Sequence, residues 1–231
     1  MSRSLASAAL ALALGAAGAA AAQGFGSIDS LWVQPAERAG GAPGCARLLL
    51  ADLPTDWQTG DAAAVVLTPR GGTVPESLQA RLVEALLREE TAVLDYPAGR
   101  PGADCPGRIA PPLAEVFGAV RALVDQAGAG LVVAIGFGPY GDAVLAATEE
   151  DLASEVLGPG GPRLAAAIAI DAPGRARFAM GAAPHPLEEW PARAPLLCAA
   201  IAAVAGLDGP QDCIAELARP QAEASLVRPR R

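Results

Sequence analysis

From residue 60 onward, continuous apolar blocks alternate with stretches in which apolar residues recur every three or four positions. Continuous blocks are typical of strands that are buried on both faces of a parallel sheet. The periodic stretches are typical of amphipathic helices. The pattern therefore predicts strands at 62–68, 91–94, 131–135 and 164–170, and helices at 75–89, 113–126 and 142–156.

The flanking regions are less regular. Residues 27–33 and 47–53 could pair as an N-terminal hairpin, and 171–195 is expected to be irregular. Further along, 196–204 could form a strand or a helix, and 213–219 a short helix. The alternation predicts an α/β fold, with a mostly parallel sheet of about five to seven strands flanked by helices on both faces.

The first 22 residues have the features of a secretory signal peptide. Arg3 precedes an apolar run that ends in three alanines, and cleavage is expected after Ala22. The mature protein is then expected in the periplasm or outside the cell, without a stable membrane anchor. We divide the rest of the chain into an N-terminal extension, an α/β domain and a flexible tail, at 23–59, 60–219 and 220–231.

The chain is acidic, with a formal net charge of −8. Its arginines are dispersed, except in the C-terminal segment 228–231, which we interpret as a solvated tail. A chain of this kind is a poor candidate for binding nucleic acid or an anionic membrane. The partners that remain are a small molecule or another protein.

Four cysteines are candidates for up to two disulfides, and their pairing is open: Cys45, Cys105, Cys198 and Cys213. The chain has no C-x-x-C pair and a single histidine, His185. A zinc site or a thioredoxin-like redox motif is therefore not expected. No cofactor is expected either.

Sites in open parallel sheets form at the carboxyl ends of strands. The predicted strands place there the segment 68–72 with Gly71 and Gly72, the acidic residues Asp95, Asp171 and Asp208, and the glycine turn 136–141. Each aspartate has an ordinary alternative role as a turn former or a helix cap.

The glycine turn reads Gly136-Phe137-Gly138-Pro139-Tyr140-Gly141 and contains no Ser, Cys or Thr. Backbone N–H groups from Gly138 to Gly141 could hold an anion or a carbonyl at a helix N-terminus, although Pro139 lacks this donor. Phe137 and Tyr140 could line a pocket or pack against helices. The spacing also matches a dinucleotide fingerprint, but it does not follow the first strand, and the next strand-end acid, Asp171, is too distant.

Together these residues resemble the exported dienelactone-hydrolase-like branch of the α/β-hydrolases, over roughly 60–217. The resemblance rests on the glycines of 68–72, on Asp95 followed by Arg100 and Cys105, on the turn 136–141, and on Asp208 followed by Pro210 and Cys213. It implies an α/β-hydrolase-like fold truncated at the C-terminus. It also implies Gly138 at the nucleophile position and Asp208 at the position of the acid.

Glycine supplies no nucleophile, and no histidine follows Asp208 to act as the base. We therefore expect a catalytically inactive binding or accessory protein. Its candidate binding residues are Gly71, Gly72, Asp95, Phe137, Gly138, Tyr140 and Gly141. One alternative is an ester or lactone hydrolase that uses Asp95, Asp208 or His185. The other is a Rossmann-type nucleotide-binding protein.

Overall fold

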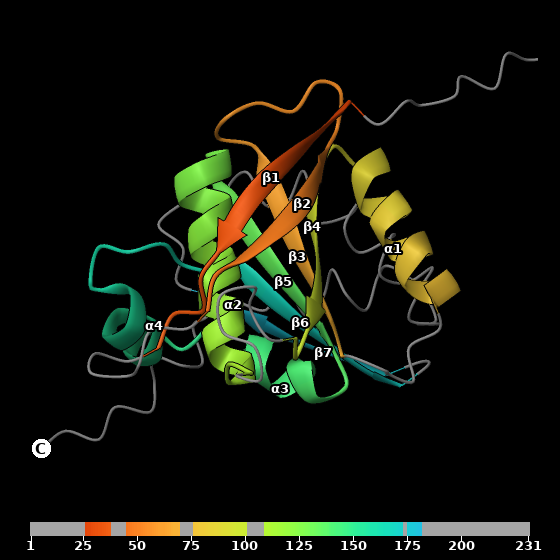
Figure 1. The fold of residues 1–231 in the computed structure, drawn as a ribbon. Coiled ribbons are helices and arrows are strands. Elements are labelled where there is room, and N and C mark those ends of the chain that lie inside the picture. Colours follow the sequence, from red (N-terminus) through yellow and green to blue (C-terminus); the bar gives the residue numbers. More distant parts are fainter. Residues whose placement is uncertain (1–25, 38–44, 70–75, 101–108, 173–174, 182–231) are drawn as a thin grey trace, which may run out of the picture.

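The computed structural model describes residues 26–37, 45–69, 76–100, 109–172 and 175–181. A seven-stranded sheet in the order β1-β2-β4-β3-β5-β6-β7 runs through the molecule (Figure 1). The strands are β1 (Ser27–Val33), β2 (Arg47–Leu53), β3 (Ala62–Pro69), β4 (Ala92–Ala98), β5 (Leu131–Phe137), β6 (Ala166–Ala172) and β7 (Arg175–Met180). The helices are α1 (Glu76–Arg88), α2 (Pro112–Ala122), α3 (Pro139–Ala146) and α4 (Glu150–Leu157), and a π-helical turn (Leu123–Ala127) extends α2.

The prediction of an α/β fold with a sheet of five to seven strands is confirmed. The sheet is mixed: β4, β3, β5 and β6 are parallel, as their continuous apolar sequences predict. The hairpin of β1 and β2 adds to one side of this parallel centre, and β7 adds antiparallel to the other. The predicted hairpin at 27–33 and 47–53 is therefore confirmed.

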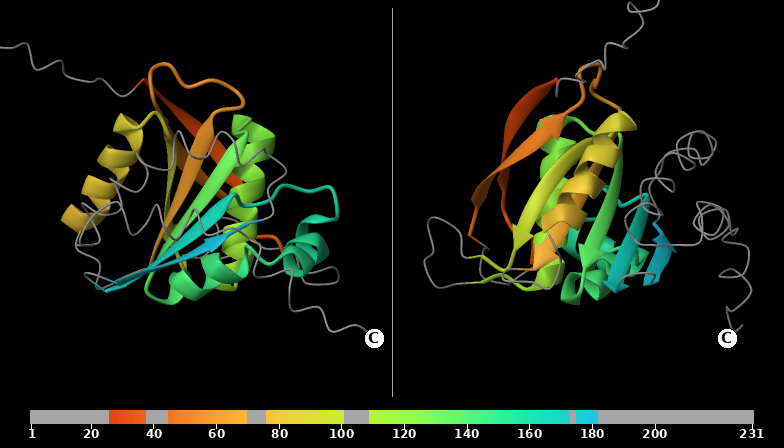
Figure 2. Two further views of the ribbon diagram at one scale, coloured as in Figure 1. Left: turned by 180° about the vertical axis from the view of Figure 1, so that it is seen from behind. Right: turned by 90° about the vertical axis from the view of Figure 1, so that its right-hand side faces the viewer.

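Helices cover both faces of the sheet (Figure 2). On one face, α2, α3 and α4 pack over a large apolar cluster that includes Leu67, Phe117 and Val144. On the other face, α1 inserts Leu82 and Leu86 into a second cluster with Ile135 and neighbouring strand residues. The crossover from β4 to β5 through α2 carries the chain past β3, so the chain changes direction between β3 and β5.

Strand β4 is longer than predicted. The prediction ended it at residue 94 and placed Asp95 in a loop, but the strand continues to Ala98, and Asp95 pairs in register with Val66. Pro97 is tolerated because β2 pairs with β4 only opposite Val93 and Leu94, which leaves the end of β4 without a neighbour on that side.

Two other expectations along the chain need revision. The segment 142–156, expected to be largely helical, is helical in two parts, and the first begins at Pro139. Its last turn ends where the Thr148 hydroxyl donates to the Leu145 carbonyl at 2.7 Å. The segment after 171 contains β7, whose Ala176 and Phe178 pack against the cluster under α1. The alternation of arginines with apolar residues in β7 is the pattern of an edge strand.

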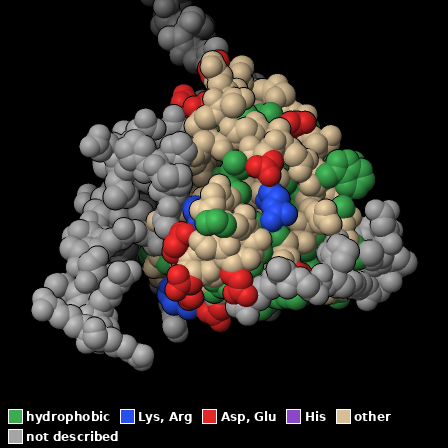
Figure 3. Space-filling view, turned by 90° about the vertical axis from the view of Figure 1, so that its left-hand side faces the viewer, with side chains coloured by type: hydrophobic (Ala, Val, Ile, Leu, Met, Phe, Trp, Pro, Cys, Tyr) green, Lys and Arg blue, Asp and Glu red, His purple; other side chains and the backbone are tan. Residues whose placement is uncertain are grey.

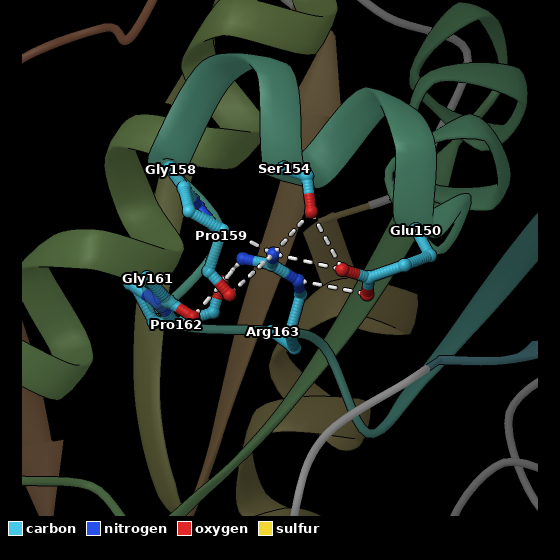
Figure 4. A network of polar contacts seen from close by, with 7 residues as sticks. All are labelled: Glu150, Ser154, Gly158, Pro159, Gly161, Pro162 and Arg163. Atoms are coloured by element: carbon cyan, nitrogen blue, oxygen red, sulfur yellow. Dashed lines mark hydrogen bonds and ion pairs between the residues drawn. The ribbon is translucent and has the colours of Figure 1, made fainter.

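Arg163 holds the segment between α4 and β6 in place (Figure 4). Its buried guanidinium donates to both carboxylate oxygens of Glu150, each at 2.9 Å, and to the Ser154 hydroxyl at 2.7 Å. It also donates to the carbonyls of Gly158 and Gly161, each at 3.0 Å. One side chain thereby ties the turn after α4 to the helix itself. Acidic side chains gather on the side of the molecule that carries α2 and α4 (Figure 3).

Several predicted features lie outside the described residues. They are the signal peptide, the tail, Gly71, Gly72, His185, Asp208, Cys105, Cys198 and Cys213. The described cysteine, Cys45, is buried and is not a free thiol. Within the described ranges, no helix combines the length and apolarity needed to span a bilayer.

Candidate functional site

The glycine turn between β5 and α3 is sharp. Strand β5 ends at Phe137, Gly138 has φ +55° and ψ −122°, and α3 begins at the next residue. The Gly138 N–H donates to the Ile170 carbonyl at 3.2 Å, and the Gly141 N–H donates back to the Gly138 carbonyl at 2.9 Å. A backbone of this kind strongly favours glycine, because other residues rarely adopt it without strain.

Two glycines of this turn serve opposite purposes. A Cβ added to Gly136 would lie 2.3 Å from the Tyr140 carbonyl oxygen, so the close approach of strand and helix requires glycine there. A Cβ added to Gly138 would meet no atom of the described residues within 4 Å. The turn therefore has space for a side chain at position 138, but glycine does not place one there.

The donors at this turn are limited. Pro139, the first residue of α3, has no N–H, and the N–H groups of Gly138 and Gly141 are bonded to carbonyls of the protein. A helix N-terminus normally offers several free N–H groups to an anion. Here the N–H of Tyr140 remains the main candidate donor of the first turn.

The turn lies at the point where ligands bind in open α/β sheets. Strands β3 and β5 are neighbours, and they connect onward in opposite directions, to β4 and to β6. The crevice at the carboxyl ends of two such strands is the usual ligand site. The chain after β3, which includes Gly71 and Gly72, lies outside the described residues.

A buried polar cluster lies next to the turn, and none of the predictions from the sequence included it. Glu115 of α2 is fully buried and accepts hydrogen bonds from the Gly99 N–H at 3.1 and 3.2 Å and from the Tyr96 hydroxyl at 3.4 Å. The Tyr140 hydroxyl also bonds to Glu115. Since Tyr140 belongs to the glycine turn, the cluster fixes the start of α3 against α2 and β4.

Arg47 of β2 supplies the positive charge of this cluster. Its Nη1 lies 3.5 Å from Glu115 Oε1, its Nη2 donates to the Pro97 carbonyl at 2.8 Å, and its guanidinium carbon lies 4.8 Å from the Tyr96 ring centre. Guanidinium groups are attracted to the faces of aromatic rings. Through these contacts, Arg47 joins the hairpin to β4 and α2.

Burial dominates the electrostatics of the cluster. Burial raises the pKa of Glu115, while the Gly99 N–H, the Tyr140 hydroxyl and Arg47 act in the opposite direction. Burial and the neighbouring Glu115 also raise the pKa of Tyr96 and of Tyr140. Both tyrosines therefore remain protonated donors throughout the ordinary pH range.

A signal for this cluster exists in the sequence. Glu115 is a lone carboxylate in the apolar run 113–120, and Arg47 lies on the same side of β2 as the buried Leu49 and Ala51. A charged residue at a position that the pattern predicts to be buried needs a partner. The sequence does not say which partner, because the two residues lie far apart along the chain.

Asp95 lies on the other face of the sheet. Its two carboxylate oxygens accept from the Gln79 side chain of α1 at 2.6 and 2.8 Å. Burial raises the pKa of Asp95, the Gln79 hydrogen bond lowers it, and the nearby Asp52 raises it. Asp95 and Asp52 line a cavity of about 530 Å³ beside α1.

The structure brings together only some of the predicted site residues. Gly138, Tyr140 and Gly141 share one turn, as the sequence analysis expects. Phe137 packs in the cluster under α1, whereas Tyr140 packs in the cluster under α2, so the two aromatic side chains lie on opposite faces. Asp95 shares the face of Phe137 and not that of Tyr140. Within the described part of the chain, no three His, Cys, Asp or Glu side chains form a cluster that could hold a metal.

Comparisons with known proteins find partial structural likeness only. No family profile and no curated protein matches the chain. An esterase domain from Rhodothermus marinus is 23% identical, with a TM-score of 0.38, over 53% of this chain and 45% of that one. An α/β serine hydrolase without a lid from Xanthomonas campestris is 16% identical, with a TM-score of 0.41, over 60% and 71%.

A third solved structure, Est1E from Butyrivibrio proteoclasticus, is 20% identical, with a TM-score of 0.34, over 51% of this chain and 47% of that one. The chain thus spans less than half of the Rhodothermus and Butyrivibrio proteins. Likeness of this extent transfers neither an activity nor a set of site residues to this chain.

Proposed function

We propose that this chain is a non-catalytic binding or accessory protein on an α/β-hydrolase-like scaffold. The observation that carries the proposal is the turn at Gly138. A sharp turn from a buried strand into a helix is how α/β-hydrolases expose a nucleophile. Here the turn keeps open space at Gly138 and presents no nucleophilic side chain.

Pro139 supports the same proposal. In the hydrolase arrangement, the residue after the nucleophile supplies a backbone N–H to the oxyanion hole. Proline cannot supply it. Nucleophile and oxyanion donor are therefore both lacking at adjacent positions, and restoring the hydroxyl alone would not restore hydrolysis. Binding of a small carbonyl or carboxylate compound in the open space is the function that remains.

The alternative functions find less support in the geometry. A hydrolase that relies on Asp95 would have to act on the face under α1, where Gln79 already occupies both carboxylate oxygens. In the dinucleotide fingerprint, the first glycine makes the tight turn that follows the strand. Gly136 instead lies within β5, next to the Tyr140 carbonyl.

An ester panel tests the proposed loss of catalysis. We expect no turnover of p-nitrophenyl esters or dienelactone by the wild type, by Gly138→Ser or by Gly138→Ser/Pro139→Ala. Wild-type turnover that disappears in Asp95→Asn, His185→Ala or Asp208→Ala would overturn the proposal in favour of an unconventional hydrolase. Turnover in Gly138→Ser alone would show that the base and the oxyanion donors are intact.

Binding is tested by thermal shift with a panel of small lactones, esters and carboxylates. Gly138→Leu would fill the open space, and we expect it to abolish any ligand-induced shift. Gly158→Leu is the matched control, because Gly158 also has positive φ (+86°) and open space around its Cβ position, but lies after α4. Equal loss of binding in both variants would remove the turn as the site.

We also propose that the protein is exported and that its cysteines form disulfides. The apolar N-terminus with its alanine-rich end and the even number of cysteines support this. N-terminal sequencing of the protein from the periplasmic or extracellular fraction should begin at Gln23. Mass spectrometry of peptides from the unreduced protein should identify the partner of Cys45.

A further inference from the structure

The hairpin of β1 and β2 has an apolar outer face. Residues that alternate with buried Leu31, Val33 and Leu49 point away from the core. They pair across the strands as Trp32 with Leu48, Ser30 with Leu50, and Ile28 with Asp52. The four large apolar side chains among them, Ile28, Trp32, Leu48 and Leu50, are between 52% and 63% exposed. A contiguous apolar face of this kind marks an interaction surface more often than isolated exposed residues do.

The free edge of β1 is closed to another strand. The Gln126 side chain accepts from the Trp32 N–H at 2.9 Å and donates to the Trp32 carbonyl at 2.7 Å. The Ser30 N–H donates to the Asp29 carboxylate at 2.7 Å. Because side chains occupy the N–H and carbonyl of Trp32 and the N–H of Ser30, an added strand would have to displace them, which favours a partner that binds to the face of the hairpin.

The apolar face leads into the cavity beside α1. Asp52 stands at the end of the face, opposite Ile28, and also lines the cavity together with Asp95 and the α1 residues Val83 and Leu87. The two aspartates project from neighbouring strands on the same face of the sheet. Face and cavity therefore adjoin at Asp52; we call the two together the groove, which is apolar along the hairpin and acidic at the cavity.

Among the described residues, none brings a positive charge to the acidic end. Neither Asp52 nor Asp95 forms an ion pair with a described residue, and the described lining of the cavity contains no arginine. Glu84, which also lines the cavity, is paired with Arg88 of its own helix. Two carboxylates in a half-buried groove repel each other, and a cation between them would relieve this repulsion. Burial raises the pKa of Asp52 and of Asp95, as expected for carboxylates without a cation.

We propose that this groove binds an amphipathic helix of a partner protein, with its apolar side on the hairpin face and a lysine or arginine between Asp52 and Asp95. Charge complementarity selects the basic residue, and the closed edge of β1 excludes an added strand. This inference concerns a surface separate from the Gly138 turn and does not depend on the function proposed for that turn.

The size of the face favours a helix over a second copy of this chain. Two seven-residue strands, with a rise of about 3.3 Å per residue and a spacing of about 4.8 Å, cover roughly 220 Å². A stable dimer usually buries about 800 Å² on each partner. A second copy would also bring further carboxylates, since the chain has a net charge of −8.

The test uses a fluorescently labelled designed peptide of about 18 residues, long enough to form a helix on binding, with leucines on one face and lysines on the other. Fluorescence anisotropy should detect binding to the wild type. We expect Trp32→Gln and Asp95→Asn each to weaken binding by at least about tenfold, as for residues central to an interface. Asp52→Asn should also weaken it.

Two matched variants control for general effects. Ile109→Gln removes another exposed apolar side chain, and Asp151→Asn removes an exposed carboxylate of α4; neither should change the affinity. Circular dichroism of each variant establishes that it is folded. A peptide of the same composition without the amphipathic order, and one with glutamates in place of lysines, should bind at least about tenfold more weakly.

Three results would overturn the proposal. One is equal affinity of the wild type and the groove variants. Another is equal binding of the peptide that has the same composition but no amphipathic order, because binding would then depend on net charge alone. The last is a concentration-dependent dimer of the wild type, seen by sedimentation, that Trp32→Gln abolishes, because a second copy would then occupy the face.

Discussion

Arg47 and Glu115 form an ion pair inside the protein, with Nη1 and Oε1 separated by 3.5 Å and side chains that are 8% and 1% exposed. Arg47 Nη1 has no hydrogen-bond partner among the described residues, so the ion pair is its main compensation. Burying two charges is costly, and removing one partner of such a pair leaves the other uncompensated. The pair joins the hairpin to α2, and the Tyr140 hydroxyl links Glu115 to the start of α3.

We therefore expect strong coupling between these two residues. Glu115→Gln keeps the shape of the side chain but leaves the Arg47 charge buried alone, and Arg47→Met leaves the carboxylate alone. Each change should destabilise the fold by about 3–5 kcal/mol. The double variant should lose less than the sum of the two, by at least about 1 kcal/mol. Urea unfolding of the four proteins measures this.

The control for that cycle is a pair of residues that do not touch. Glu115→Gln combined with Arg177→Gln, on the distant strand β7, should be additive within about 0.5 kcal/mol. If Arg47→Met and Glu115→Gln were additive as well, the ion pair would contribute nothing specific. The cluster would then be a consequence of packing.

The sequence was informative where a local pattern decides the structure. Continuous apolar blocks predicted the parallel strands, and Leu82 and Leu86 marked the buried side of α1. Asp95 and Pro97 were misread because an acid and a proline usually end a strand. They remain within β4 because its neighbour β2 has already diverged there, which is a property of the whole sheet.

The candidate site was predictable to the same extent. The turn at Gly138 could be predicted, since its glycines follow a buried strand. The pairing of Glu115 with Arg47 could not, because it depends on the hairpin folding back over β4. The groove beside Asp52 could not be predicted either. It forms where β2 separates from β4, and no pattern in the sequence of either strand indicates this separation.

Alanine substitutions should separate the roles of two glycines in the turn. Gly136→Ala places a Cβ 2.3 Å from the Tyr140 carbonyl oxygen, and the resulting overlap should cost about 3 kcal/mol or more. Gly138→Ala meets no atom of the described residues and adds only backbone strain at φ +55°, which should cost about 1–3 kcal/mol. Thermal and urea unfolding provide the comparison.

Gly160→Ala is the reference for these glycine variants. Gly160 also has open space around its Cβ position, and it has no positive φ. Its substitution should change stability by no more than about 0.5 kcal/mol. A larger loss in Gly138→Ala than in Gly136→Ala would contradict the close approach of β5 and α3.

Glu150 should make stability depend on pH in the acid range. Its hydrogen bonds to Arg163 and Ser154 lower the pKa of the carboxyl from 4.5 to about 2. A group whose pKa is lowered by folding stabilises the protein above its unfolded pKa and loses this effect as the pH falls. The wild type should therefore exceed Glu150→Gln in stability above pH 4.5, and this advantage should fade as the pH approaches 2.

The effect of Glu150 should be small, because its side chain is half exposed; we expect at most about 1 kcal/mol. Melting temperatures of both proteins across the acid range measure it, with Asp151→Asn as the control for a neighbouring carboxylate that forms no ion pair with a described residue. A constant difference between wild type and Glu150→Gln at every pH would mean that Glu150 acts through packing or hydrogen bonding and not through its charge.

Gln126 should protect the protein from self-association. Gln126→Ala removes both hydrogen bonds to Trp32, which should cost about 1 kcal/mol of stability for each bond. It also frees the edge of a strand whose outer face is apolar, and such edges recruit further strands.

Sedimentation at increasing concentration should show oligomers of Gln126→Ala and a monomer for the exposed neighbour variant Asp125→Ala. Gln126→Glu should be intermediate, because the carboxylate still accepts from the Trp32 N–H but cannot donate to its carbonyl. If Gln126→Ala remained monomeric at all concentrations, the charge of the chain and not the closed edge would be what keeps the hairpin from pairing.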